Sequence, residues 1–392
     1  MVKFRLVNIS TGNWGVRSLV LGALTGLCAW NVLAADWTEY RGPDNNGISS
    51  EKISTAFPAG GPKVKWKVPS ANGFSSFVIA GGRCFTQELR SVENTEQEVL
   101  VARDAETGAE KWFQPLGTMK VNDGGQSGTP ENSGGDGPRS TPATDGSHVW
   151  TFSGRLVLQC FDARSGKEVW KRDLVKEHAG AIPRWMNAQS PVLDGNLVYV
   201  AGGGPGESLL ALNKKDGSIT WKAFDEKATH ATCVPATILG ERQVIYFLQS
   251  GLLSVAAKTG KELWRYPFKY NVSTAASPVV DGDIVYCSAG YSVGAGAVRI
   301  SRPDGGWKAT EIYRFTGDKP LANHWSTPVL HQGHLYGMFQ FKEYGAGPMK
   351  CVELATGKVK WSKPGFGPGN VILIGQQVLA LSDAGELVVV DA

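Results

Sequence analysis

Residues Ala102 to Trp112 read A-R-D-A-E-T-G-A-E-K-W, and this stretch decides the fold because the chain repeats it. Four more copies keep the glycine four residues before the tryptophan: CFDARSGKEVW from Cys160, ALNKKDGSITW from Ala211, SVAAKTGKELW from Ser254 and CVELATGKVKW from Cys351. A degenerate copy runs from Ala297 to Tyr313, and Trp66 stands alone in the strand-like segment Lys63–Lys67. Self-similarity of this kind is the signature of a repeat architecture.

A second motif precedes each copy: a Ser-Pro or Thr-Pro, then a glycine turn, then an apolar strand. Residues Ser277 to Ser288 (SPVVDGDIVYCS) read as two short strands joined by an Asp-Gly turn, which is a strong hairpin signal. A third strand leads into the Asp/Asn-x-x-Thr/Ser-Gly turn, where glycine can adopt positive φ. A fourth strand carries the tryptophan, so one repeat predicts a blade of four antiparallel strands.

The repeat spacing predicts how the blades are arranged. The final aromatic residues stand 43 to 58 residues apart, at Trp66, Trp112, Trp170, Trp221, Trp264, Tyr313 and Trp361. This period fits a β-propeller, in which a large aromatic at a fixed place docks each blade on the next. We therefore predict an all-β propeller over residues 63–392 with these seven side chains as structural docking residues. It has either seven blades or an incomplete ring of eight, the chain being truncated inside a motif at Asp391-Ala392.

The pattern A-x-D-x-x-T-G-x-x-x-W resembles the tryptophan-docking motif of the PQQ-like (quinoprotein) propeller repeat family, and Ala102 to Trp112 matches every fixed position. The opening Trp37 to Pro43 (WTEYRGP), followed by Asn46 to Ser49 (NGIS), is similar to the lead-in of exported bacterial members. Those members are usually assigned by resemblance to the propeller lipoprotein of the outer-membrane protein assembly machinery. The resemblance implies a role in cell-envelope protein assembly.

The same resemblance leaves an enzyme as an alternative. Enzymes of this superfamily are typically longer, and many carry an adjacent cysteine pair beneath the quinone. Here Cys84, Cys160, Cys233, Cys287 and Cys351 are widely spaced, and we expect buried thiols rather than disulfides. No set of calcium-ligand acids with a catalytic Asp is recognisable. We expect a non-enzymatic binding or scaffold propeller without cofactor or metal; PQQ and calcium belong only to the alternative, a quinone-dependent dehydrogenase.

Candidate ligand residues lie in the segments between a tryptophan strand and the next Ser-Pro strand, because these segments share one face of a propeller. Arg184 and Trp185 lie together in one long segment, and Arg139, His324 and Trp325 hold similar places in others. An aromatic beside a cation near the axis suits an anionic or extended ligand. These five residues predict an axial-face site for a protein partner or a polysaccharide, with structural packing of each side chain as the alternative.

The start of the chain predicts export. Residues 1–35 contain Lys3, Arg5, Arg17 and no acid, then the apolar run Ser18 to Trp30 and small residues before Asp36. This pattern indicates a secretory signal peptide, followed by a lead-in segment over 36–62 and a periplasmic or secreted propeller. The apolar run is short for a membrane span. An uncleaved anchor and acylation of the leader cysteine at position 28 are the alternatives.

The charge of the chain without this leader argues against nucleic acid. The whole chain has 40 basic and 36 acidic residues, for a formal net charge of +4. Without residues 1–35 the count is 37 basic against 36 acidic. No basic field remains that would attract a nucleic acid.

We expect the exported protein to begin near Asp36, because the small residues before it form the cleavage signal. Intact-mass and N-terminal peptide spectrometry of the exported product measures this directly. A mature product that still contains residues 1–30 contradicts the prediction.

Overall fold

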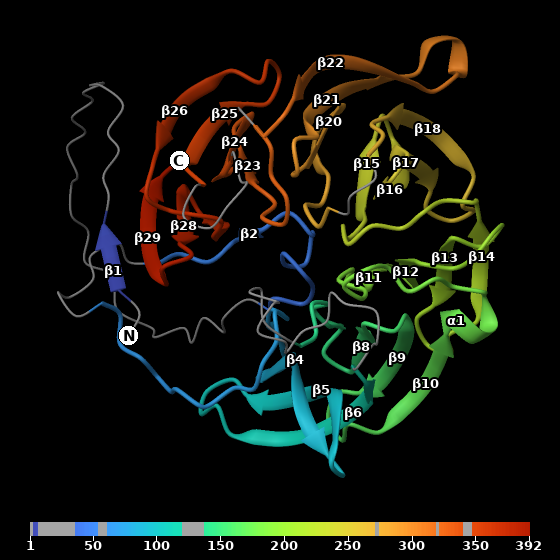
Figure 1. Cartoon of the computed structure of the whole chain (residues 1–392), viewed down its shortest axis with the longest axis vertical. Helices are drawn as coiled ribbons and strands as arrows, with labels where there is room; N and C mark the ends of the chain where they lie inside the picture. The colour runs from blue at the N-terminus through green and yellow to red at the C-terminus, as the bar shows by residue number, and fades with distance from the viewer. Residues whose placement is uncertain are drawn as a thin grey trace, which may run out of the picture.

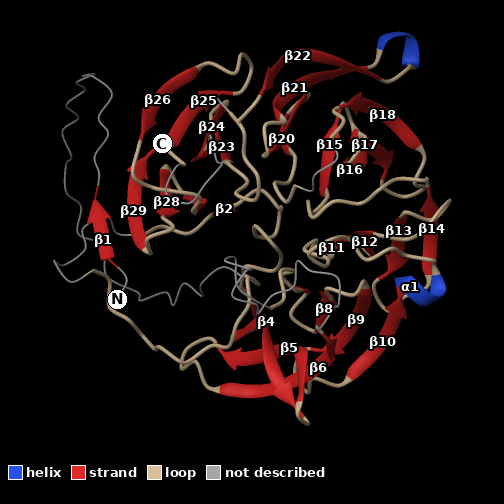
Figure 2. Cartoon of the chain, viewed as in Figure 1, coloured by secondary structure: helices blue, strands red, loops and turns tan. Residues whose placement is uncertain are grey.

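The computed structural model describes residues 3–6, 36–53, 61–119, 137–270, 274–318, 321–339 and 347–392. Most of the predicted signal peptide and of the Gly/Ser-rich segment 120–136 lies outside the described residues. Within them, seven sheets surround a central axis in sequence order (Figure 1). Helix is limited to α1 Leu174–Glu177 and the 3-10 turn η1 Pro303–Gly305 (Figure 2). The predicted all-β propeller is confirmed. No helix among the described residues is long and apolar enough to cross a membrane.

Blades 1 to 6 each consist of four consecutive antiparallel strands, with the first nearest the axis (Figure 1). Blades 1 to 3 comprise β3 Val78–Ala80, β4 Arg83–Val92, β5 Thr95–Asp104 and β6 Glu110–Thr118; β7 Ala143–Thr144, β8 His148–Phe152, β9 Val157–Asp162 and β10 Glu168–Asp173; β11 Val192–Asp194, β12 Leu197–Ala201, β13 Leu209–Asn213 and β14 Ile219–Ala223. Blades 4 to 6 comprise β15 Val234–Ile238, β16 Glu241–Leu248, β17 Gly251–Ala256 and β18 Glu262–Pro267; β19 Val279–Asp281, β20 Ile284–Ala289, β21 Gly294–Ser301 and β22 Lys308–Thr316; β23 Val329–His331, β24 His334–Met338, β25 Met349–Glu353 and β26 Val359–Lys363.

Blade 7 differs in how it is assembled. Its own three strands, β27 Asn370–Ile374, β28 Gln377–Leu381 and β29 Glu386–Asp391, are antiparallel. Two strands from the start of the chain complete the sheet, and both are parallel to their neighbours. β2 Ile48–Ser49 pairs with β27 on the axial side, and β1 Lys3–Leu6 pairs with β29 on the outer side.

Tryptophan rings lie on glycines of the following blade. A Cβ added to Gly166 would come within 2.8 Å of the Trp112 ring, and one added to Gly217 within 2.6 Å of the Trp170 ring. Both glycines also have φ near +70°, so both the backbone conformation and the neighbouring ring exclude a residue with a side chain at these positions. At Gly357 the nearest ring is that of Phe315, with Tyr313 beside it. The rings of Trp170, Trp221 and Trp264 are buried, whereas those of Trp112, Trp361, Tyr313 and Trp66 are half-buried.

Trp66 makes the same contact with blade 1. Its ring lies 2.6 Å from a Cβ placed on Gly108, and its indole N–H donates to Ala105 O at 3.0 Å. Trp221 likewise donates to Ala257 O, which is also three residues before the contacted glycine. The segment Lys63–Lys67 is nevertheless not a strand, and it does not pair with β29, where β1 lies instead. The strand-like segment of the sequence thus supplies a docking side chain but does not form a strand.

Six clusters of buried side chains each join two neighbouring blades, from blades 1 and 2 through to blades 6 and 7. Among the described residues no such cluster joins blade 7 to blade 1. In Figure 1 the chain after residue 61 runs between these two blades at the lower left. We call this junction the seam. The ring has seven blades, which is within the predicted range of seven to eight.

The lead-in crosses the axis and ties blades together. Trp37 exchanges two backbone hydrogen bonds with Ile79 of blade 1, and Thr38 O accepts from Thr144 N–H of blade 2. The Glu39 carboxyl accepts from Leu193 N–H of blade 3 at 2.8 Å. Further on, the Arg41 guanidinium donates to backbone carbonyls of blade 6 at 2.8 and 2.9 Å. Residues 37–49 therefore bridge blades 1, 2, 3, 6 and 7.

We expect Trp221→Ala to lower the free energy of unfolding by roughly 3–5 kcal/mol, because a buried ring and its hydrogen bond to Ala257 O are lost. Urea denaturation measures this. Trp307→Ala, which removes a half-buried indole from the η1 turn, serves as the control. A loss for Trp221→Ala no larger than for the control contradicts the docking role.

Glu39 should make stability depend on pH. Burial raises the pKa of its carboxyl to about 8, against the lowering effect of the Leu193 N–H and Asn45 hydrogen bonds. The folded state therefore keeps a proton that the unfolded chain releases near the usual carboxyl pKa of 4.5, so stability falls as pH rises from about 4.5 to about 8. We expect Glu39→Gln to flatten this fall by a few kcal/mol, at about 1.4 kcal/mol per pKa unit. Unfolding at pH 5.5 and 8.5 tests it, with Glu96→Gln, an exposed position, as control.

Candidate functional site

Backbone N–H groups donate to hydroxyl oxygens of the next blade around the axis. Four such bonds of 2.9–3.0 Å run from Ser76 to Thr141, Thr141 to Ser190, Ser190 to Thr232, and Ser277 to Thr327. The Ser-Pro and Thr-Pro motifs of the sequence therefore mark a hydrogen-bonded hub. Since each hydroxyl holds the same place in its blade, residues at a fixed offset from it lie at the same end of the ring.

The position two residues before each hub residue gathers candidate ligand side chains. In blades 1 to 6 it holds Phe74, Arg139, Ala188, His230, Ala275 and Trp325. Two of the five predicted site residues, Arg139 and Trp325, are thus equivalent, and Arg184 with Trp185 lies just before Ala188. The hub arrangement brings the predicted residues to one axial face. We call Arg139, Arg184, Trp185, His230, His324 and Trp325 the axial cluster.

Trp185 links two blades of this cluster. The Arg184 guanidinium lies 4.6 Å from the centroid of the Trp185 ring, in a cation–π contact. The Trp185 ring lies 6.4 Å from the His230 ring, and the His230 Nε2 lies 2.7 Å from Met186 O. Trp185 and Met186 both have φ of 66°, a conformation that costs energy for bulky residues. Such strain at two consecutive residues is typical of ligand sites.

His324 and Trp325 form the other half of the cluster. Their rings lie 4.8 Å apart, and the ring of Tyr291 meets that of His324 edge-on at 4.7 Å. Tyr291 is itself 54% exposed, so this aromatic group continues to the surface. Five aromatic rings in two groups, Trp185 with His230 and His324 with Trp325 and Tyr291, therefore lie on this face with the arginines.

Electrostatic effects connect the members of the cluster. Burial lowers the pKa of His230 to about 4, the hydrogen bond to Met186 O opposes this, and the charge of Arg139 lowers it further. Burial also lowers the pKa of His324 to about 4, with a smaller contribution from His230. Both imidazoles are neutral at neutral pH, so Arg139 and Arg184 supply the positive charge of the cluster.

Arg139 also lies near a buried acid. The Glu98 carboxylate is almost fully buried and accepts from Gly154 N–H at 2.9 and 3.1 Å. Burial raises its pKa to about 7, while that hydrogen bond and the charges of Arg139 and Arg155 lower it. The Arg139 guanidinium lies 5.1 Å from the Phe74 ring centroid. Arg139 therefore lies against the Phe74 ring, and its charge reaches the Glu98 carboxyl.

Hydrogen bonds between successive loops fix the cluster in place. The Gln189 amide donates to Thr229 O at 2.9 Å, and His230 N–H donates to Thr274 O at 3.0 Å. The Thr274 hydroxyl donates to His324 O at 3.0 Å. A continuous set of bonds therefore runs through the loops before blades 3, 4, 5 and 6. The site is organised before any ligand arrives, which reduces the entropy lost on binding.

Sequence analysis missed His230, Tyr291 and Phe74. His230 stands five residues before Pro235, so alignment of the repeats on proline gave it no equivalent. The hub hydroxyl of blade 4 is Thr232, three residues before that proline. Alignment on the Ser and Thr residues would have placed His230 beside Arg139 and Trp325.

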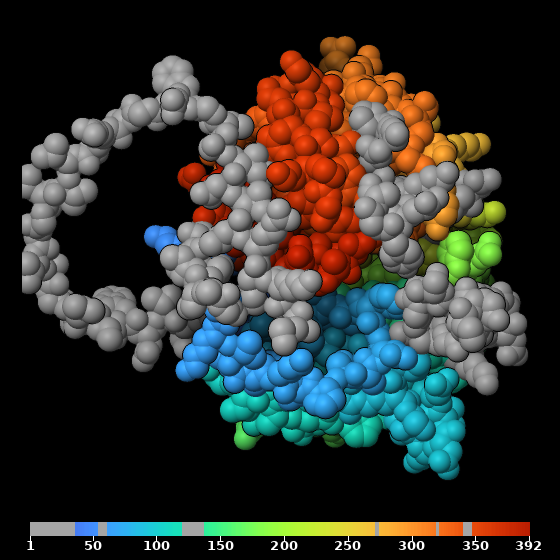
Figure 3. All heavy atoms as spheres, turned by 60° about the vertical axis from the view of Figure 1, so that its left-hand side comes forward, coloured from blue at the N-terminus to red at the C-terminus, as the bar shows by residue number. Residues whose placement is uncertain are grey.

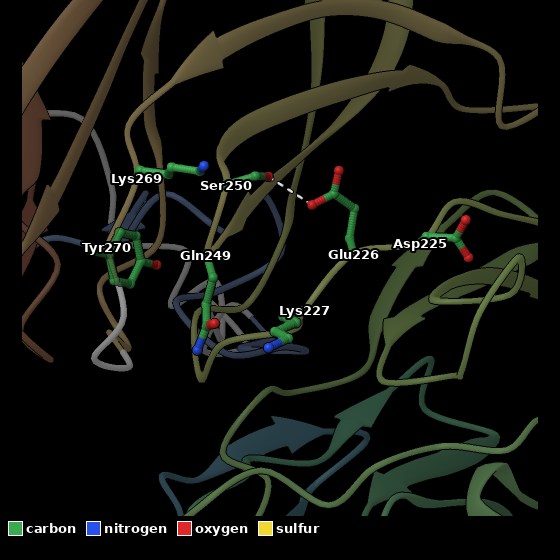
Figure 4. A pocket seen from close by; sticks show the side chains of 7 residues that line it. All are labelled: Asp225, Glu226, Lys227, Gln249, Ser250, Lys269 and Tyr270. Atoms are coloured by element: carbon green, nitrogen blue, oxygen red, sulfur yellow. Dashed lines mark hydrogen bonds between the residues drawn. The ribbon is translucent and has the colours of Figure 1, made fainter.

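A second feature on this face is a pocket of about 570 Å³ between blades 3 and 4 (Figure 4). It is lined by Asp225, Glu226, Lys227, Gln249, Ser250, Lys269 and Tyr270. The Glu226 carboxylate accepts from the Ser250 hydroxyl at 2.7 Å and pairs with Arg265. Glu226 is therefore already paired. The exposed cations of the pocket are Lys227 and Lys269.

Among the described side chains, no group of three His, Cys, Asp or Glu residues could hold a metal ion. The five described cysteines are buried free thiols, each in a different blade. Burial raises the pKa of Cys84 to about 11 and that of Cys160 to about 12, so these thiols are poor nucleophiles at neutral pH.

The fold, the tryptophan–glycine contacts and the hub define a β-propeller of PQQ-like repeats. More narrowly, the chain belongs to the family of the outer membrane protein assembly factor BamB, whose model matches residues 95–338.

Individual proteins are also similar to this chain. The outer membrane protein assembly factor BamB of Moranella endobia (strain PCIT) is 25% identical over 281 residues, which is 67% of this chain and 66% of that relative, just under two thirds of its length. BamB from Moraxella catarrhalis is 13% identical with a TM-score of 0.54, covering 81% of this chain and 82% of that one. A quinohemoprotein alcohol dehydrogenase from Comamonas testosteroni is also 13% identical, with a TM-score of 0.57 and coverage of 88% and 70%. At these identities the two solved structures show the fold alone.

Proposed function

We propose that this chain is an exported, non-enzymatic propeller that binds polypeptide chains at its axial cluster during the assembly of cell-envelope proteins. The observation that carries the proposal is the convergence of two arginines and several aromatic rings at one end of a hydrogen-bonded hub. Arginine and tryptophan dominate protein-binding surfaces because each combines a large contact area with directed polar groups. Membership of the BamB family supports an assembly role and a protein partner.

The electrostatics of the cluster suggest what it binds. The two imidazoles are neutral, so the cations are the Arg139 and Arg184 guanidiniums, which donate to carboxylates and to backbone carbonyls. The aromatic rings offer faces for apolar side chains. An extended polypeptide supplies all of these groups at once. Polysaccharide binding, the other ligand considered from the sequence, receives no support from the relatives.

The test is binding of a urea-unfolded outer-membrane β-barrel protein, diluted into buffer with the full chain and followed by fluorescence anisotropy. We expect Arg184→Ala and Trp185→Ala each to weaken binding about tenfold or more, which corresponds to about 1.4 kcal/mol. Arg302→Ala is the matched control, because Arg302 makes the same contact with Trp307 at 4.9 Å on the η1 turn.

Equal binding by the Arg184→Ala, Trp185→Ala and Arg302→Ala chains contradicts the proposed site, provided that all three melt at the wild-type temperature. The quinone-dependent dehydrogenase is tested on the same material. Turnover of an alcohol or sugar with a dye acceptor after addition of PQQ and Ca²⁺ would establish the enzyme instead.

A further inference from the structure

The pocket between blades 3 and 4 contains two cations without counterions. Lys227 lies in the segment between β14 and β15, Lys269 lies after β18, and both are exposed. Among the residues that the structure describes, neither ammonium forms an ion pair or a hydrogen bond. The side-chain amide of Gln249, in the turn between β16 and β17, makes no hydrogen bond to them either. Figure 4 shows these three side chains around one space.

The acids of the pocket are already engaged. The Glu226 carboxylate accepts from the Ser250 hydroxyl at 2.7 Å and pairs with the Arg265 guanidinium. The Asp225 carboxylate accepts from Gly206 N–H, and in Figure 4 it points away from the other labelled side chains. The two lysines therefore set the charge inside the pocket, which favours an anionic ligand.

Hydrogen bonds hold the pocket in shape. Gln249 N–H donates to Lys227 O and Tyr270 N–H donates to Gln249 O, each at 3.2 Å, so the β16–β17 turn is bonded to both walls. The Tyr270 ring, which lines the pocket, is buried and lies 5.3 Å from the Phe247 ring. A pocket that is formed in advance loses little entropy when a ligand enters it.

The pocket lies in a part of the ring where each blade is packed on both sides. Figure 1 places blades 3 and 4 on the right, across the ring from the seam, and Figure 3 brings blades 7 and 1 to the front instead. Apolar clusters join blade 4 to blade 3 and to blade 5. The spacing of the pocket walls is therefore fixed by the fold and does not depend on the seam.

The walls of the pocket continue into the axial cluster. Lys227 stands three residues before His230, and Tyr270 stands four residues before Thr274. His230 N–H donates to Thr274 O at 3.0 Å, which joins the two segments beyond the pocket. Three extended residues span at most about 11 Å. A polypeptide bound at the axial cluster therefore reaches the pocket with a side chain about three residues away.

We propose that the pocket is a carboxylate subsite, which takes an Asp or Glu side chain of the polypeptide bound at the axial cluster. Lys227 and Lys269 pair with the carboxylate, and the Gln249 amide donates a further hydrogen bond to it. The volume of about 570 Å³ is within the range of ligand sites. The proposal rests on the proposed function, because the acidic side chain belongs to the same bound polypeptide. The subsite selects segments in which an acid stands about three positions from an aromatic residue.

The experiment compares two peptides that differ only in charge. The first is EAAWAAE, in which an acid stands three positions from the tryptophan on either side, so that the direction of binding does not matter. The second is QAAWAAQ. Both are acetylated and amidated, which removes the terminal charges. Calorimetric titration of the full chain should show about fivefold tighter binding of the Glu peptide, the size expected from two partly exposed ion pairs.

Variants of the lysines locate the preference. A chain with both Lys227→Gln and Lys269→Gln should bind the two peptides equally. The matched control carries Lys258→Gln and Lys261→Gln, the same change of charge in the β17–β18 turn at the other end of blade 4, and should keep the fivefold preference. Raising the ionic strength from about 0.1 M to about 1 M shortens the Debye length from about 10 Å to about 3 Å and should remove most of the preference.

Cross-linking gives a second measurement that needs no variant. A carbodiimide joins a carboxylate to an amine without a spacer, so it reports only groups in direct contact. We expect the Glu peptide to be joined to Lys227 or Lys269 of the wild-type chain, and not to Lys258 or Lys261, as mapped by mass spectrometry of tryptic peptides.

Several results would overturn the proposal. They are no binding of the Glu peptide, equal binding of both peptides by the wild-type chain, or a fivefold preference that survives loss of both lysines. Cross-links confined to other lysines would contradict it as well. Vesicles of phosphatidylglycerol that bind the wild-type chain but not the chain without Lys227 and Lys269 would assign the pocket to a phosphate headgroup instead.

The outcome for the pocket can be separated from that for the axial cluster. Arg184→Ala should weaken binding of both peptides to the same extent and leave their ratio unchanged. If Arg184→Ala and Trp185→Ala change neither affinity while loss of the two lysines removes the preference, the axial site fails and the pocket stands. If Arg184→Ala weakens both affinities while loss of the lysines changes nothing, the pocket fails and the axial site stands.

Discussion

The contact between an indole ring and a glycine of the next blade is the constraint on which the ring depends. At Gly166, Gly217 and Gly260 the ring occupies the space that any Cβ would need, and the backbone has positive φ. The same glycine also closes the turn between the third and fourth strands of its own blade. One residue therefore sets both the shape of a blade and its distance from the preceding one. This double demand explains why glycine and tryptophan keep a fixed spacing although the two that touch belong to different blades.

Much of the fold could be predicted because the repeat records local chemistry. The Asp-Gly turn at Asp281-Gly282 does join β19 to β20, as its hairpin signal indicates. The degenerate fifth blade was harder: no atom lies within 4 Å of a Cβ on Gly305, so Trp264 has no glycine there and donates to Gln243 instead. The path of the lead-in could not be predicted, since most of its hydrogen bonds join backbone groups, which leave no pattern in a sequence.

In the candidate site, too, residues marked by a local motif could be predicted, whereas contacts between blades could not. Arg139 and Trp325 could be predicted because each comes directly before a Ser-Thr-Pro run, which marks the hub. Arg184 and Trp185 could be predicted as a neighbouring pair. The aromatic partners of His324 and Arg139 could not be predicted. Tyr291 reaches His324 from a turn of another blade, and Phe74 contacts Arg139 across a blade boundary. Contacts between blades depend on register around the ring, and no motif within one blade encodes that register.

The lead-in explains how the ring persists across its seam. The six apolar clusters hold the blades in one arc, but they leave blade 7 attached to blade 6 alone. Residues 37–49 add hydrogen bonds from the axis to blades 1, 2 and 3 on one side and to blades 6 and 7 on the other. A typical net value is about 1 kcal/mol per neutral hydrogen bond, and about 1.5–3 kcal/mol for a bond from a charged group such as the Arg41 guanidinium. Together these bonds link blades 7 and 1 through the axis, where no apolar cluster of the described residues joins the two. The two ends of the arc are therefore joined at the axis rather than at the rim.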